Sequence, residues 1–162
     1  MFHCFNWHTI KLFVASLVAF IALDCLWIFF LMKDMYKEKL AVVSHMGGAG
    51  IFDYKCLAAL AVWALIVKGI ILFVLPRTHG SYLCALLKGG IYGLIIYGTY
   101  ELTNYAVLPN WPTEIVGYDI AWGVFICAVV TAFAVWMAKM CGCEHMCSCN
   151  CDGEGKKSCR SK

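Results

Sequence analysis

The chain has 162 residues, of which 62% are apolar, 15% aromatic and 14% charged, whereas roughly a quarter of the residues of an average soluble domain are charged. Its formal net charge is only +3, and no basic face with interleaved aromatic residues lies outside the apolar runs, which excludes a nucleic-acid partner. The composition indicates a membrane protein rather than a soluble one.

Four long apolar runs follow one another along the chain, at residues 10–32, 56–75, 82–108 and 117–138. Each reaches or exceeds the roughly 20 residues that a helix needs to cross a bilayer core of about 30 Å. The first, second and fourth runs carry almost no polar face, which every helix of a soluble bundle would need. We therefore predict an all-α, polytopic membrane protein in which residues 1–139 form an up-down bundle of four transmembrane helices embedded in membrane lipids.

The first run is too long for a signal peptide and has no small-residue cleavage pattern near its end, so we expect a retained helix. Phe2, Phe5 and Trp7 precede or open this run and predict an aromatic anchor at the membrane interface. The connection at residues 33–55 contains the glycine patch MGGAG. This patch lacks the Gly-Lys-Ser/Thr of a phosphate-binding loop and predicts a flexible connector.

Lysine and arginine residues near the ends of the spans predict the orientation, because they favour the cytoplasmic side. With four spans, Lys11, Arg77, Lys88 and Lys139 flank one side of the membrane, and residues 101–117 on the other side contain no lysine or arginine. The lysines of the first connection argue against the other signals. We predict a multi-pass protein with both termini in the cytoplasm.

The third run differs from the others because polar and small residues are set into it at helical spacing. Between Gly89 and Tyr105 such residues recur every four positions, with Tyr100 and Asn104 beside them, which places them on one side of a helix. The pair Gly89 and Gly93 has the Gly-x-x-x-Gly spacing that lets another helix approach closely. That helix could belong to the same chain or to a second copy, so a homodimer is one alternative.

Three of the runs each carry a carboxylate, namely Asp24, Glu101 and Asp119. A charged side chain in the bilayer costs about 2.5 to 3.5 kcal/mol on insertion scales, so these groups should face protein or water rather than lipid. At a rise of about 1.5 Å per residue, an up-down topology brings all three into the half of the bundle away from the cytoplasm. Lys68 of the second run should lie deeper, roughly midway through its helix.

We predict that these carboxylates and their neighbours line one polar pocket between the helices. Several carboxylates in a low dielectric cannot all ionise easily, so such a pocket would exchange protons or bind a cation. This favours a protein that binds or transports a small solute or a proton. The predicted ligand- or proton-binding residues are Asp24, Trp27, Tyr97, Tyr100, Glu101, Thr103, Asn104, Asp119 and Trp122.

Two alternatives stay open for these polar residues. They could simply hydrogen-bond across helices and hold the bundle together, at about 0.6 to 2 kcal/mol for each contact, which would make the protein a structural one. They could also serve a membrane-embedded enzyme in which one carboxyl group donates a proton and another accepts it. The spans show no His-x-x-Glu-His, Gly-x-Ser-x-Gly or Cys/His arrangement, so no catalytic class is indicated and catalysis is the less favoured use.

Four blocks of sequence resemble the signature of a known family. They are LDCLW at residues 23–27, YGTYELTN at 97–104, the dipeptide Trp111-Pro112, and DIAWG at 119–123. In order and spacing they are similar to a family of small, mostly bacterial, predicted membrane proteins catalogued as the domain of unknown function DUF2177. The resemblance covers residues 10–138 and implies four helices but no activity. Glu101 stands where that family usually has aspartate, and Lys68 stands where an apolar or small residue is expected.

The tail at residues 140–162 is rich in cysteine and lies outside the resemblance. Repeated Cys-x-Cys spacing is typical of thiolate clusters for soft metals such as Zn or Cu, because alternate thiolates can converge on one ion. Cysteines just beyond a membrane helix are also candidates for acylation, and an unmodified disordered tail is the third alternative. The predicted metal ligands are Cys141, Cys143, His145, Cys147, Cys149 and Cys151.

Overall fold

The computed structural model describes residues 7–33, 54–109 and 111–140. Several predictions concern parts of the chain outside these ranges and stay predictions. They are the anchoring role of Phe2 and Phe5, the glycine patch of the first connection, and the metal site or acylation of the tail.

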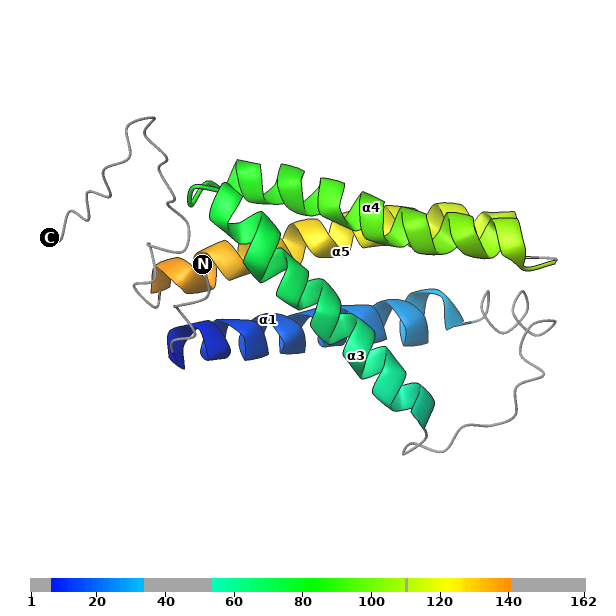
Figure 1. Ribbon diagram of the computed structural model, residues 1–162, viewed down its shortest axis with the longest axis horizontal. Coiled ribbons are helices and arrows are strands. Elements are labelled where there is room, and N and C mark those ends of the chain that lie inside the picture. The colour runs from blue at the N-terminus through cyan, green and yellow to red at the C-terminus, as the bar shows by residue number, and fades with distance from the viewer. Residues whose placement is uncertain (1–6, 34–53, 110, 141–162) are drawn as a thin grey trace, which may run out of the picture.

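Four helices in the described part of the chain are long and apolar enough to cross a membrane, which confirms the predicted all-α bundle (Figure 1). The start of α1 and the end of α5 lie at the same end of the molecule, as an even number of crossings requires. The elements in order are α1 (Trp7–Leu26) with the π-helical segment η1 (Trp27–Leu31), α3 (Tyr54–Gly69) with the π-helical η2 (Ile70–Val74) and the 3-10 helix η3 (Leu75–Arg77), α4 (Tyr82–Val107) and α5 (Thr113–Met140).

The change of helix type in the second span has a cause in the sequence. Pro76 has no N–H to donate and its ring clashes with the carbonyl one turn earlier, so regular α-helical bonding ends before it and the chain passes through η2 and η3. A tight turn follows, in which His79 and Gly80 both have positive φ angles of 50° and 71°. Ser81 then caps α4, because its hydroxyl accepts a hydrogen bond from the Cys84 N–H.

The closest pairing in the bundle is between α4 and α5, which lie side by side in Figure 1. Small residues make this approach possible. A Cβ placed on Gly93 would overlap the backbone of Gly123, and a Cβ placed on Gly89 would lie 2.5 Å from the Thr131 hydroxyl. The glycine pair of the third span therefore faces α5 of the same chain, which is the intramolecular use of the Gly-x-x-x-Gly spacing.

Helix α3 is arranged differently from the other three. In Figure 1 it crosses α1 and the α4–α5 pair obliquely. Its contact with α4 and α5 is made mainly through η2, near the turn into α4. There Ile70, Ile71 and Val74 are buried. Much of the earlier part of α3 consequently lies on the surface of the bundle.

The buried face of α1 is a single stripe, made of Leu12, Ser16, Phe20 and Asp24 at intervals of four residues. Large apolar side chains are exposed on the outer surfaces of all four spans, with Val18, Leu65, Ile95 and Phe125 as examples. Such a continuous apolar surface is expected of a protein whose surroundings are lipid rather than water.

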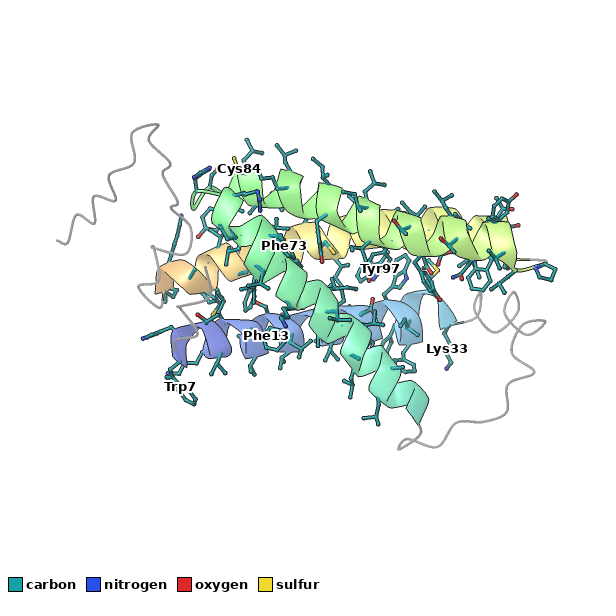
Figure 2. All side chains as sticks on the ribbon, in the orientation of Figure 1. Trp7, Phe13, Lys33, Phe73, Cys84 and Tyr97 are labelled. Carbon is teal, nitrogen blue, oxygen red and sulfur yellow. The ribbon has the colours of Figure 1, made fainter. Side chains whose placement is uncertain are left out.

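Basic residues gather at the end of the bundle where α1 starts and α5 ends, here called the Trp7 end. Lys88 donates to the carbonyl of Arg77, and Arg77 donates to the carbonyl of Phe73. The ammonium of Lys139 lies 4.4 Å from the centre of the Tyr82 ring. Figure 2 places Trp7 and Cys84 at this end and Lys33 at the opposite one. The grouping agrees with the predicted topology, and the cytoplasmic location of this end stays a prediction.

Candidate functional site

Asp24 is buried, with 7% of its surface exposed, and both of its carboxylate oxygens accept hydrogen bonds from tryptophan side chains. The Trp122 indole N–H donates to Oδ1 at 2.9 Å and the Trp63 indole N–H donates to Oδ2 at 2.8 Å. Since Asp24 lies on α1, Trp63 on α3 and Trp122 on α5, a single carboxylate joins three helices.

Trp27 completes the group of side chains around Asp24. Its ring stacks on that of Trp122, with centroids 4.5 Å apart and an angle of 5° between the planes. The Trp27 indole nitrogen is buried and has no hydrogen-bond partner among the described residues. We call the group of Asp24, Trp27, Trp63 and Trp122 the Asp24 cluster. Its carboxylate is held in place by donors that carry no charge.

Glu101 forms a second group with residues from α5 and from the α4–α5 connection. It is only 1% exposed although it lies within a membrane-spanning helix. The Trp111 indole N–H donates to Glu101 Oε2 at 3.0 Å, and the Asp119 carboxyl group lies close enough to that of Glu101 to interact with it. We call these three residues the Glu101 cluster.

The contact between Glu101 and Asp119 brings two carboxyl groups together, which affects how they bind protons. An ionised carboxylate can only accept hydrogen bonds, so two carboxyl groups can bond to each other only when one of them keeps a proton. Such a pair takes up and releases protons as a unit rather than as two independent groups. A proton shared between these two carboxyl groups would relieve their repulsion in the interior of the bundle.

The two clusters are adjacent because of helical spacing on α4 and α5. Asp119 and Trp122 are separated by three residues on α5, and Tyr97 and Glu101 by four on α4, so each pair lies on one face of its helix. Tyr97 is half-buried against the core, and its ring fills the space that a Cβ on Gly123 would need. Figure 2 labels Tyr97 between the α4–α5 pair and α1.

The remaining predicted site residues lie in different environments. Tyr100 is 59% exposed and Thr103 is also exposed, so both point away from the two clusters. Asn104 is half-buried, and its amide nitrogen is buried without a hydrogen-bond partner among the described residues. The structure therefore brings together Asp24 with Trp27 and Trp122, and Glu101 with Asp119, but does not gather all nine residues around one cavity.

Two tryptophans contribute to these clusters and were not among the predicted site residues. Trp63 lies in a run that is apolar apart from Lys68, and the only sign of a polar role for Trp63 is that tryptophan is the one large apolar side chain with an N–H donor. Trp111 belongs to the family-like dipeptide at the α4–α5 connection, and its spacing from Glu101 gave no helical relation to it.

Within the described ranges, no group of three or more histidine, cysteine, aspartate or glutamate side chains is arranged to hold a metal ion. The described free cysteines, Cys25, Cys84 and Cys127, come from three different helices. The predicted metal ligands all belong to the tail, outside these ranges.

The architecture and the family match identify the kind of protein. Four apolar helices without a described strand, joined by buried polar clusters, make this chain an integral multi-pass membrane protein. Residues 9–136 match the family of predicted membrane proteins DUF2177, and the chain belongs to that family. No curated protein and no solved structure matches it.

Proposed function

We propose that this membrane protein takes up and releases a proton inside the bundle through the Glu101 cluster, and that this exchange is linked to the binding or transport of a small solute. The observation that supports the proposal is the contact between the buried Glu101 carboxyl group and that of Asp119. Two adjacent carboxyl groups away from water are most stable when they share a proton. A pair of this kind is a costly way to join two helices, because amides would do so with a lower desolvation cost.

A route to the pair is suggested by the surface beside it. A hollow at the α4–α5 connection is lined by residues 105–109 together with Trp111 and Thr113. Trp111 therefore lies between this hollow and Glu101, to which it donates its hydrogen bond. Movement of one indole ring would open the carboxyl pair to the hollow.

A structural role is the second candidate, and the Asp24 cluster favours it. Both oxygens of Asp24 are already used by indole donors from other helices, so this carboxylate has the contacts expected of a clamp. The two roles divide between the clusters, with Asp24 holding three helices together and the Glu101 pair exchanging the proton.

Proton flux into proteoliposomes tests this function. With a pH-sensitive dye inside and a potassium diffusion potential imposed, we expect Glu101→Gln and Asp119→Asn to lower protein-dependent proton flux by on the order of tenfold or more, because each removes one member of the exchanging pair. Thr103→Ala changes an exposed residue of the same helix and should leave the flux unchanged. Equal flux in folded wild type, Glu101→Gln and Asp119→Asn would sink the proposal.

A further inference from the structure

Lys68 is a charged residue on the outer surface of a membrane span. The second span runs over Leu57–Arg77, which places Lys68 within about one residue of its middle. Its neighbours Ile66, Val67 and Ile70 are buried, whereas Lys68 is exposed. No hydrogen bond or ion pair is made by its ammonium within the described part of the chain.

The exposed residues around Lys68 form a regular pattern. Five exposed positions of α3 and η2 follow one another at alternating intervals of three and four residues, the spacing by which one helix packs against another. We call them the Lys68 stripe, and they are Ala58, Ala61, Leu65, Lys68 and Leu72. Two alanines at one end of the stripe would allow a close approach of the second helix.

The position of Lys68 is costly unless a partner is present. A lysine at the centre of a membrane helix costs about 2.5 to 3.5 kcal/mol on insertion scales. The nearer end of the span, at Arg77, is nine residues away, or about 14 Å along the helix axis, and this distance is too great for the side chain to cover fully. A negatively charged group close to Lys68 would therefore stabilise it in the membrane.

The carboxylates of the described chain do not supply this counter-charge. Asp24 and Glu101 are buried in their clusters, and Asp119 lies beside the Glu101 carboxyl group. Glu114 is exposed but is the second residue of α5, far from mid-depth. In a symmetric contact between two copies through the same stripe, Lys68 would face Lys68, which is unfavourable for like charges.

We propose that the Lys68 stripe binds a transmembrane helix of another membrane protein, one that carries an aspartate or glutamate at the middle of the bilayer. The ion pair would supply the counter-charge, and the apolar positions of the stripe would fix the register of the partner helix. This interaction is independent of proton exchange at the Glu101 cluster, since Lys68 lies on the opposite side of α3 from the buried residues that face the core.

Energy transfer in liposomes between the full chain, labelled at its N-terminal amine, and synthetic transmembrane peptides tests the proposal. The peptides share a leucine and alanine host sequence and carry aspartate, lysine or leucine at their centre. We expect the aspartate peptide to bind wild type about 3- to 30-fold more tightly than the leucine peptide, the range that interhelical polar contacts of about 0.6 to 2 kcal/mol produce. Lys68→Leu should remove this preference, and Lys68→Asp should transfer it to the lysine peptide.

Two controls keep the test decisive. Lys139→Leu removes an exposed lysine at the end of α5 and should leave the preference intact, and the unfolding of Lys68→Leu in detergent should match wild type because the residue is exposed. The proposal is overturned if aspartate and leucine peptides bind equally, or if Lys68→Leu keeps the preference. Energy transfer between two labelled copies that disappears in Lys68→Leu would also overturn it, in favour of self-association.

Discussion

Replacing Asp24 with alanine is expected to lower the free energy of unfolding in detergent micelles by about 2 to 4 kcal/mol, because two buried indole N–H groups on different helices lose their acceptor. The Asp24 carboxylate is the one described group that bonds both α3 and α5 to α1. Titration with a denaturing detergent, followed by helical circular dichroism, measures the loss. Asp24→Asn keeps one acceptor oxygen and should show roughly half of it.

Ser16 provides a matched control for this prediction. It lies on the same buried face of α1, is fully buried, and has a hydroxyl with no hydrogen-bond partner among the described residues. Ser16→Ala therefore removes a polar atom without breaking a bond and should change the free energy by less than about 1 kcal/mol. If Asp24→Ala were no more harmful than Ser16→Ala, Asp24 would not be a clamp between helices.

The pairing of α4 with α5 predicts an equally clear contrast between two glycines. Gly93→Ala should destabilise the bundle by about 1 to 3 kcal/mol, because the new methyl group would overlap the Gly123 backbone, which cannot move aside as a side chain can. Gly98→Ala, on the same helix, meets no atom within 4 Å. It should be neutral, or stabilising by up to about 1 kcal/mol through its better helix propensity. The same denaturation assay compares them.

A similar loss in both glycine variants would contradict this assignment. It would mean that the cost comes from the helix itself and not from its contact with α5. A loss at Gly93 accompanied by a change from monomer to dimer, or the reverse, would instead connect this face to a second copy of the chain.

The fold could be predicted from the sequence because the bilayer imposes simple requirements. Each apolar run had to be long enough to cross the bilayer, and its backbone N–H and C=O groups had to hydrogen-bond within the run. A helix meets both requirements. The glycine pair and Glu101 marked the inner face of the third span correctly, since Gly89, Gly93 and Glu101 are buried. The predicted stripe was wrong at Tyr100 and Tyr105, which are exposed. The changes of helix type around residues 27–31 and 70–77 left a sequence signal only at Pro76.

The candidate site was predicted less completely, and the reason is geometric. Helical spacing and depth identified Asp24, Glu101 and Asp119 as residues at similar levels, but they do not determine which carboxylate meets which donor. That choice depends on the rotation of each helix about its own axis. The oblique crossing of α3 brings Trp63 to Asp24, and the α4–α5 connection folds Trp111 back onto Glu101.

The separate environments of the carboxylates have a consequence for function. The Asp24 carboxylate accepts hydrogen bonds from two neutral donors, whereas the Glu101 carboxyl group lies beside that of Asp119, an arrangement in which two carboxyl groups can share a proton. In the proposed proton exchange, a change in the charge of the Glu101 cluster would leave the contacts of the Asp24 cluster in place and the bundle folded.

The cysteine-rich tail at residues 140–162 and the orientation of the bundle in the membrane are independent of the two carboxylate clusters. Binding of Zn or Cu by the tail cysteines, acylation of those cysteines, and the cytoplasmic location of both termini are still predictions from the sequence. The basic residues at the Trp7 end support the orientation, since Lys11, Arg77, Lys88 and Lys139 all come from helix ends that meet there.

Infrared spectroscopy of the carboxyl groups tests the central claim most directly, because the carbonyl-stretch band of a protonated carboxyl group is distinct from the bands of a carboxylate. At neutral pH we expect wild-type protein in liposomes to show this band, the double variant Glu101→Gln with Asp119→Asn to lack it, and Asp24→Asn to keep it. Absence of the band in wild type, or its persistence in the double variant, would contradict a shared proton between Glu101 and Asp119.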